Sequence, residues 1–353
     1  MSTKYPLLVM SKRKRISPAW GIIGGLLGVV VLVCGVVLIW PQMFGLQRTL
    51  PFTQLISFRL VGLLCLAAAL ILVLILLLVS RQSRALFGTT AVMLTLVLVA
   101  GGGIYLVRGL ATNVPPTNAD GSISVLSWNT LGNQPGSPTI AQLALEREAD
   151  VVVLPETTED MGIEIAGIMS EQGRPMWVLS NSGAPGYAAA ETTILISSDL
   201  GEYQLNTDLG DTSALATVIA EPVDGDGPRF IAAHAIAPTP EYMDQWRSDL
   251  EWLSTVCNGN TILAGDLNAT VDHLWGLGTI DGATLGECFD AAQAAGAASS
   301  GTWTSGRPPM LVPAIDHVMS TSQWEVTGFE VITSADRAGS DHRPVFAELT
   351  PAS

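Results

Sequence analysis

The first 110 residues contain no aspartate or glutamate, and no lysine occurs anywhere after Lys14. All 32 acidic residues therefore lie in residues 111–353, where the basic residues other than histidine are seven arginines. This second part of the chain carries a formal charge of 7 − 32 = −25. Proteins that bind nucleic acids usually present a basic face, which seven arginines supply poorly. The charge therefore disfavours long polyanions as ligands, and it suits an extracytoplasmic or salty setting in which acidity keeps a protein soluble.

Cysteine is scarce, and the sequence lacks two common catalytic patterns. It has no Cys/His spacing of the kind that holds zinc and no serine nucleophile elbow, which counts against both chemistries. Of the four cysteines, Cys34 and Cys65 fall in long apolar runs, where they act as small apolar residues. Cys257 and Cys288 lie in the acidic part. Either a disulfide or two buried thiols fits this pair, because sequence gives no distance between them.

Three long apolar runs contain no charged residue: Trp20–Trp40, Leu60–Val79 and Leu86–Val107. Each has the length of about 20 residues that a helix needs to cross a bilayer. The first run is too long for a cleaved signal peptide, and no clear cleavage site follows it. We therefore expect three transmembrane helices. Because transport pathways usually need ionisable groups within the membrane, the runs predict an anchor and not a transporter.

The distribution of cations predicts the orientation of these helices. The N-terminal tail carries five cations, and the loop between the second and third runs carries Arg81 and Arg84. The loop between the first and second runs carries Arg48 and Arg59. Since cytoplasmic segments are the more basic ones, the N-terminus is predicted in the cytoplasm and the acidic part outside. The expected division is a cytoplasmic tail (1–19), a multi-pass cell-membrane region (20–107), a polar linker (108–122) and a globular domain (123–351).

The globular part has many short apolar strands and few helices. This composition favours an α/β sandwich over a doubly wound parallel sheet. Predicted helices cover 140–147, 159–172 and 240–256. Predicted strands cover 124–129, 149–156, 177–180, 192–197, 214–220, 230–235, 261–264, 315–319, 324–332 and 345–349.

Polar residues follow five of the apolar segments at or near their ends: Asn129, Glu156, His234, Asp266 with Asn268, and Asp341 with His342. Loops at strand ends are where catalytic groups usually lie. Carboxylate and amide oxygens suit hard cations such as Mg²⁺. Hydrolysis of a phosphoester needs charge neutralised on the phosphoryl oxygens, a nucleophilic water and a group that takes its proton. Together these residues supply what that reaction needs.

Six short motifs, in order, resemble those of the endonuclease/exonuclease/phosphatase superfamily. They are Ser127-Trp128-Asn129, Leu154-Pro155-Glu156, Ala233-His234, Gly265-Asp266-Leu267-Asn268, Ile315-Asp316-His317 and Ser340-Asp341-His342-Arg343-Pro344-Val345. That superfamily includes pancreatic-type deoxyribonucleases, abasic-site endonucleases, inositol polyphosphate 5-phosphatases and neutral sphingomyelinases. The resemblance covers about residues 123–351, and the whole chain is similar to bacterial membrane-anchored members. It implies a four-layer α/β sandwich, in which two mixed β-sheets are flanked by helices.

The resemblance also implies a role for each residue. Asn129, Glu156 and Asp341 would bind the metal, with Mg²⁺ expected and Mn²⁺ as the alternative. The implied catalytic residues are His234, Asp266, Asn268, Asp316, His342 and Glu191. Among these, His342 would act on the scissile phosphate or on the water, with Asp316 fixing its tautomer. Asp266 and Asn268 would position the nucleophile, His234 would face the phosphate, and Glu191 would orient His234.

Three further residues are interpreted as follows. His317 points away from the site on its strand and is expected to be structural. His273 is left without a role, and Trp303 either lies near the substrate pocket or belongs to the core.

The sequence therefore predicts a membrane-anchored, metal-dependent phosphoesterase. Its partners would be the lipid bilayer and a phosphoester substrate, either nucleic acid or a phospholipid or sugar phosphate, and no protein partner is predicted. The alternative is a catalytically silent membrane receptor or scaffold that keeps the fold.

Overall fold

The computed structural model describes residues 17–114, 121–184, 186–279 and 282–352. The basic tail before residue 17 and the middle of the expected linker, 115–120, lie outside the described residues. The chain forms two compact units. The first comprises residues 1–39 and 63–101, and the second comprises residues 40–62 and 102–353.

Three helices are long and apolar enough to cross a membrane: α1 (Pro18–Ile39), α3 (Arg59–Val79) and α4 (Arg81–Arg108). Glycines on α1 permit close packing within the first unit. A Cβ on Gly24 would lie 2.5 Å from the carbonyl oxygen of Ala85 on α4, and one on Gly28 would lie 2.8 Å from Thr89 Cγ2. Small residues of this kind let membrane helices approach each other closely.

The second unit is the predicted four-layer sandwich, and the α/β fold class is confirmed. One sheet has seven strands in the order β1-β14-β15-β2-β3-β5-β4, and the other has six in the order β12-β13-β9-β8-β7-β6. The first sheet comprises β1 (Asn113–Val114), β2 (Ile123–Ser127), β3 (Val151–Pro155), β4 (Met176–Ser182), β5 (Glu191–Ser197), β14 (Trp324–Val331) and β15 (Val345–Pro351). The second comprises β6 (Tyr203–Leu205), β7 (Val218–Pro222), β8 (Arg229–His234), β9 (Thr261–Asp266), β12 (Phe289–Asp290) and β13 (Asp316–Ser320).

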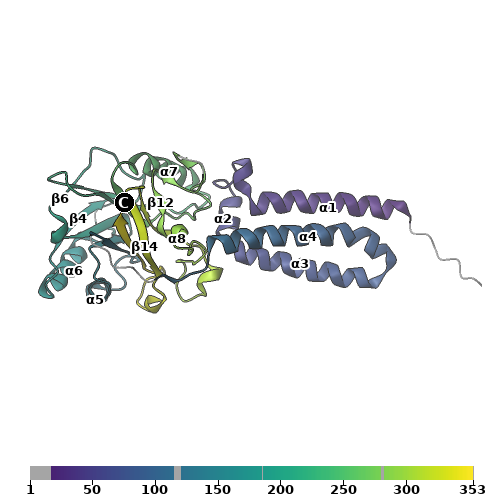
Figure 1. The fold of residues 1–353 in the computed structure, drawn as a ribbon, viewed down its shortest axis with the longest axis horizontal. Coiled ribbons are helices and arrows are strands. Elements are labelled where there is room, and N and C mark those ends of the chain that lie inside the picture. The colour runs from purple at the N-terminus through teal and green to yellow at the C-terminus, as the bar shows by residue number, and fades with distance from the viewer. Residues whose placement is uncertain (1–16, 115–120, 185, 280–281, 353) are drawn as a thin grey trace, which may run out of the picture. The chain divides into compact units, whose positions relative to one another are not determined.

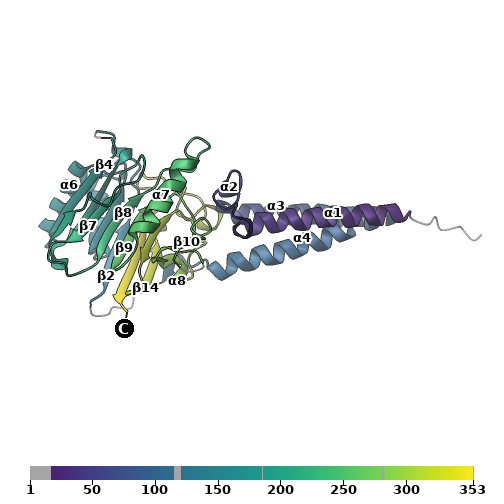
Figure 2. The same ribbon diagram turned by 90° about the horizontal axis from the view of Figure 1, so that it is seen from above.

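Alternating apolar side chains along the strands build three buried layers. In β3, Val151 and Val153 enter the core between the two sheets, whereas Val152 and Leu154 pack on the opposite face. That opposite face is covered by α5 (Ser137–Glu146) and α6 (Glu159–Glu171). The outer face of the second sheet packs against α7 (Met243–Val256). Figure 2 shows α6 and α7 on opposite outer sides of the sheets. The remaining short elements are α8 (Ala291–Ala294) and the small sheet of β10 (Leu277–Gly278) and β11 (Leu285–Gly286).

Strand prediction was accurate where the apolar pattern was long. The structure differs from the expected strand 214–220, because β7 begins only at Val218. Strands β1, β6, β10, β11 and β12 were not predicted, since two or three residues carry too little periodicity. The open question about the acidic-part cysteines is also answered. Cys257 and Cys288 form a disulfide with a Cα–Cα distance of 5.9 Å.

The segment between α1 and α3 belongs to the second unit (Figure 1). It contains a short 3₁₀ turn, η1 (Pro41–Phe44), and the helix α2 (Phe52–Ser57). Gln54 Nε2 donates to the carbonyl of Pro238 at 2.7 Å, and Arg48 Nη1 donates to the carbonyl of His273 at 2.7 Å. We call residues 40–58 the interhelical segment. Because its polar side chains bond to loops of the sandwich, the sandwich unit extends beyond the expected residues 123–351.

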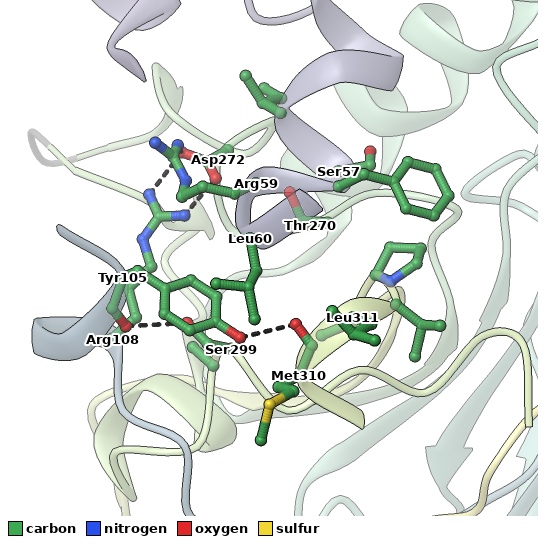
Figure 3. Close-up of a pocket in the computed structure, with 16 residues that line it drawn as sticks. Ser57, Arg59, Leu60, Tyr105, Arg108, Thr270, Asp272, Ser299, Met310 and Leu311 are labelled. Atoms are coloured by element: carbon green, nitrogen blue, oxygen red, sulfur yellow. Dashed lines mark hydrogen bonds and ion pairs between the residues drawn. The ribbon is translucent and has the colours of Figure 1, made fainter. Parts of the chain in front are cut away.

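A buried ion cluster strengthens this attachment (Figure 3). Asp272, whose side chain is 2% exposed, accepts from Arg59 Nη2 at 2.9 Å and forms a second ion pair with Arg108. Gln42 of the interhelical segment also donates to Asp272. Burial alone would raise the pKa of Asp272, but the two arginines outweigh burial and hold that pKa below its ordinary value. The acid therefore stays ionised and ties together the ends of α3 and α4 in the second unit.

Candidate active site

The topology brings the ends of several strands to one edge of the sandwich. β2 runs parallel to β3, and β8 runs parallel to β9, so these four strands end on the same side of their sheets. β13 is antiparallel to β9 and β15 is antiparallel to β2, so both begin where their neighbours end. Asp266 is directly paired with His234 on one side and with Asp316 on the other. The register therefore places acids and histidines from separate segments next to one another.

Asn129 joins the two sheets at this edge. Its side chain is fully buried, and Nδ2 donates to Glu156 Oε1 at 3.0 Å and to Asp266 Oδ2 at 3.0 Å. Its Oδ1 accepts from the backbone N–H of Leu131 at 3.0 Å. Asn129 was predicted as a metal ligand through its oxygen. In this arrangement the amide instead links two carboxylates, and its oxygen is occupied by the backbone.

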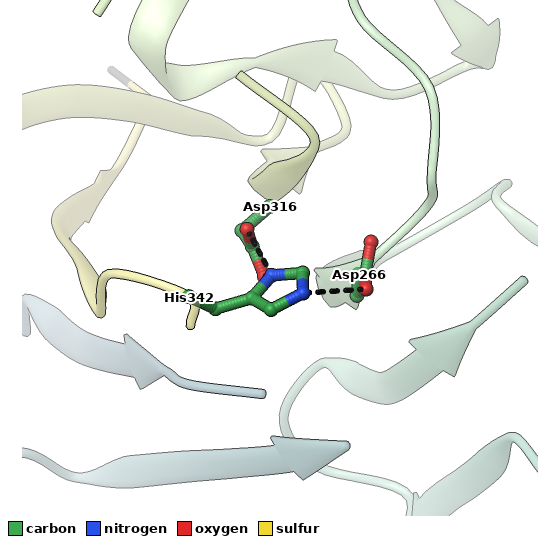
Figure 4. Close-up of side chains that lie close together, drawn as sticks. All are labelled: Asp266, Asp316 and His342. Carbon is green, nitrogen blue, oxygen red and sulfur yellow. Dashed lines mark hydrogen bonds and ion pairs between the residues drawn. The ribbon is translucent and has the colours of Figure 1, made fainter. Parts of the chain in front are cut away.

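His342 and Asp316 form a buried pair (Figure 4). The Nδ1 of His342 lies 2.9 Å from Asp316 Oδ2 and 3.1 Å from Asp316 Oδ1. Its Nε2 faces Asp266 Oδ2 at 3.7 Å. Burial opposes the charged imidazolium, but Asp316 and Asp266 outweigh it and raise the pKa of His342 to about 10. The predicted partnership of Asp316 with His342 is thus present in the geometry, with Nδ1 held and Nε2 directed into the site.

Asp341 has one partnered and one unpartnered oxygen. Oδ2 accepts from Trp303 Nε1 at 2.9 Å. Oδ1 is buried and has no hydrogen-bond partner among the described residues. A buried carboxylate oxygen without a donor is costly unless a cation or another donor reaches it. Asp341 therefore offers a ligand atom, and Trp303 proves to lie beside the site.

The loop that carries Asp341 and His342 is anchored by residues for which no role was predicted. Ser340 Oγ donates to the carbonyl of Asn129 at 2.6 Å and accepts from the N–H of His342 at 3.0 Å. Arg343 is 1% exposed, and its Nε lies 2.6 Å from Asp336 Oδ1. An arginine directly after the histidine was the available signal for this anchor, but its partner Asp336 follows no local pattern.

His234 is buried beside Glu156, with Nε2 3.9 Å from Glu156 Oε1. Burial, together with the charge of His342, lowers the pKa of His234 to about 3, so the ring is neutral at physiological pH. Its Nδ1 has no hydrogen-bond partner among the described residues. Glu191 was predicted to orient this ring. It accepts instead from the N–H of Gly186 at 3.1 Å, and within the described chain no hydrogen bond joins it to His234.

The turn after β9 fixes Asp266 and Asn268. The N–H of Asn268 donates to Asp266 Oδ1 at 2.8 Å, and Asn268 Nδ2 donates to the carbonyl of Ala235 at 3.0 Å. The turn begins at Gly265, where φ is +139° and a Cβ would lie 1.9 Å from the carbonyl oxygen of Ala233. Only glycine fits this position. Asn268 and Glu156 both have positive φ, at 47° and 59°, a strained conformation often found at functional sites.

The donor set fits a divalent cation. Four acids converge with a single protonated histidine, and burial raises the pKa of both Glu156 and Asp266. Raised carboxylate pKa values mark a site that lacks positive charge. The ligand-type atoms of Asp266, Asp316 and His342 lie within 4.8 Å of one another. Because Asp316 already accepts from Nδ1 of His342, this trio suits proton handling better than metal binding, and Glu156 and Asp341 remain the better ligands.

Two other histidines lie outside the site. His317 was expected to be structural, and its Nδ1 lies 2.6 Å from Asp290 Oδ2 while Nε2 lies 2.7 Å from the carbonyl of Ala269. His273, which was left without a role, contacts the carbonyl of Thr53 in α2 through Nε2 at 3.1 Å. Both rings are buried and fully engaged, so neither faces the acids.

Solved structures with the same fold support this architecture. A humanized D. rerio TDP2 carrying 14 mutations is 16% identical, with 65% of this chain and 99% of that chain covered and a TM-score of 0.50. The D. rerio TDP2 complexed with a single-strand DNA product is also 16% identical, covers 65% of this chain and 100% of its own, and has a TM-score of 0.49. An endonuclease/exonuclease/phosphatase from Beutenbergia cavernae is 18% identical, with coverages of 66% and 72% and a TM-score of 0.47. No curated protein matches the sequence.

The sequence itself carries the family assignment. Residues 126–342 match the endonuclease/exonuclease/phosphatase family, and this stretch is more than half of the chain. It runs from the strand before Asn129 to His342 and so includes every motif found in the sequence. The chain belongs to the endonuclease/exonuclease/phosphatase family.

Proposed function

We propose that the protein is a membrane-anchored, Mg²⁺-dependent phosphoesterase whose catalytic domain lies outside the cytoplasmic membrane. The observation that carries the proposal is the convergence of Glu156, Asp266, Asp316, Asp341 and His342 at one edge of the sandwich. Substrates of this site would be nucleic acids or phospholipid or sugar phosphates. The anchor would comprise the apolar runs within residues 20–107, after a cytoplasmic tail.

Glu156 and Asp341 would hold the metal, with Asn129 beside them. When bound, the metal would neutralise phosphoryl oxygens and favour deprotonation of water. The metal-ligand role of Asp341 is supported by its buried, unpartnered oxygen. The role of Glu156 is supported by its place between Asn129 and His234.

The other residues would handle protons and bind the phosphate. Hydrolysis adds hydroxide to phosphorus and a proton to the leaving oxygen, so the site needs an acceptor and a donor. Asp266, held by Asn268, would accept the proton of the attacking water. His342, kept protonated by Asp316, would donate a hydrogen bond to a phosphoryl oxygen through Nε2. The neutral ring of His234 would donate a second one.

A metal titration tests the proposal. The full chain should hydrolyse bis(p-nitrophenyl) phosphate only after Mg²⁺ is added, and EDTA should abolish turnover. Glu156→Gln should need at least about tenfold more Mg²⁺ for half-maximal activity, because ligand groups set metal affinity. The matched control is Glu159→Gln, which removes an exposed acid three residues away in α6. Activity that is equal with Mg²⁺ and with EDTA would refute the proposal. A folded protein without any turnover would favour the silent receptor.

The orientation has its own test. A reporter enzyme that functions only in the cytoplasm, fused after Ser353, should be silent, while the same reporter fused before Met1 should be active. The reason is the excess of cations in the tail and in the loop with Arg81 and Arg84. A strong signal from the C-terminal fusion would reverse the proposed topology.

A further inference from the structure

A cavity of about 490 Å³ lies beside the candidate active site. Its volume falls within the range of about 300–1,000 Å³ that is typical of small-molecule sites. The walls are mostly apolar and come from the interhelical segment, from the loop after His234 and from the stretch before Asp316. Among the lining residues are Leu50, Phe58, Pro238, Pro240, Trp303 and Ile315.

The cavity is continuous with the site through shared residues. Asn268 lines the cavity and, through its backbone N–H, holds Asp266. Trp303 lines the cavity and donates to Asp341. Ile315 lines it and directly precedes Asp316. A molecule whose phosphate contacts the acids and His342 would therefore have its adjoining part in an apolar space.

The opposite wall belongs to the part of the second unit that adjoins the candidate membrane spans in sequence. Phe58 lines the cavity and is followed immediately by α3, which begins at Arg59. The same segment exposes large apolar side chains, including Met43 (66%), Phe44 (49%) and Leu55 (48%). Trp40, also half exposed, follows the last residue of α1. Aromatic and apolar residues at the end of a spanning helix are suited to the membrane interface.

Charge separates the two substrate classes. Of the described residues that line the cavity, none is a lysine or arginine. A polynucleotide carries further phosphates next to the one that is cut, and binding them needs cations. A hydrocarbon chain needs none, and its burial in an apolar cavity is favourable. The lining and the formal charge of −25 on residues 111–353 favour the second class.

We propose that this cavity binds the hydrocarbon chain of a bilayer lipid whose phosphoester lies at the acid and histidine cluster, so that the substrate is a membrane lipid phosphoester. The inference rests on the proposed phosphoesterase function. It adds the substrate class and gives the interhelical segment a role in specificity. Lipid would enter from the bilayer that holds the chain, with its phosphate at the polar end of the cavity.

A chain-length series tests the inference without knowledge of the head group. The full protein in nanodiscs is given ethyl or octyl p-nitrophenyl phosphate, below the concentration at which the octyl ester forms micelles. The nitrophenolate released is the same for both. The ratio of kcat/KM for octyl to ethyl should be at least about 10, because each buried methylene favours binding. A ratio near 1 would overturn the inference.

Variants locate the effect. Phe58→Glu places a charge in the cavity and should reduce the octyl-to-ethyl ratio at least about fivefold. Thr239→Glu, on another wall, should act in the same way. The matched control is Leu55→Glu, which introduces the same charge on the same segment outside the cavity lining and should leave the ratio unchanged. If both cavity variants keep the wild-type ratio, the cavity does not bind the chain.

A third ester covers the competing class. Thymidine 5′-(p-nitrophenyl phosphate) carries a base and sugar in place of the alkyl chain. It should be hydrolysed with a lower kcat/KM than the octyl ester. A higher value would overturn the inference in favour of a nucleotide substrate while leaving the proposed function intact. Failure to hydrolyse any of the three esters with Mg²⁺ would instead refute the proposed function itself.

Discussion

The double variant Arg59→Gln/Arg108→Gln should lower the thermal unfolding midpoint of the second unit by about 6 to 20 °C. Breaking a buried ion pair typically costs about 3–5 kcal/mol, because one charge is left in the interior without its partner. For a domain of about 150–250 residues, each kcal/mol shifts the midpoint by about 2–4 °C. Here the stranded charge would be Asp272, whose side chain is 2% exposed. Circular dichroism of the purified full chain measures the midpoint.

A surface pair and a rescue make this test specific. Arg147→Gln removes the partner of Glu330 from a pair that is 26% and 22% exposed. Exposed pairs contribute about 0–1 kcal/mol, so this control should shift the midpoint by less than about 4 °C. Adding Asp272→Asn to the double variant removes the stranded charge and should recover most of the loss. A double variant as stable as the Arg147→Gln control would show that the cluster does not support the fold.

The penalty should also depend on pH with a defined sign. In the wild type the arginines lower the pKa of Asp272, so its stabilising contribution is present above its unfolded pKa of about 3.9 and is lost as pH falls through the folded pKa. In the double variant, burial acts alone and raises that pKa. Protonation then removes the stranded charge as the solution becomes acidic. The difference in midpoint between the two proteins should be largest near pH 7 and should shrink toward pH 4.

This cluster shows a limit of reading the sequence. The sandwich was predictable because strands such as β3 alternate between two buried faces, and that pattern is local. Asp272 is bound to Arg59 and Arg108, which lie 213 and 164 residues away in the chain. No periodicity or spacing signals such a pair. For this reason the interhelical segment and the residues after α4 were assigned to the membrane region and linker, although the structure places residues 40–62 and 102–114 in the second unit.

The candidate site shows the same division. Its acids and histidines could be found because each follows or precedes an apolar strand, and strand ends meet at one edge of a sheet. How they pair could be found only in part. The contact of Asp316 with His342 matches the prediction, whereas Glu191 bonds to Gly186 within its own turn. A loop contact of this kind depends on backbone geometry over a few residues, which the residue types do not determine.

Asp316→Asn should reduce kcat for bis(p-nitrophenyl) phosphate by about 10²- to 10⁴-fold, the usual contribution of a positioned acid–base group. The change keeps the shape but replaces the charged acceptor at Nδ1 of His342 with an amide. Without Asp316, the largest positive influence on the pKa of His342 is lost, and Nε2 no longer reliably carries the proton directed at the phosphate. KM should change much less, because Asp316 acts through His342 and not on the substrate.

Asp290→Asn provides the matched control, because Asp290 holds His317 in an equally buried pair away from the site. It should lower stability, yet kcat per folded molecule should stay within about threefold of wild type, since no group at the reacting phosphate changes. Residues that act as one unit are also non-additive. His342→Asn alone should therefore cost about as much as His342→Asn combined with Asp316→Asn. Additive losses in the double variant would mean that Asp316 acts independently of His342, and the pair could not be the proton-handling unit of this site.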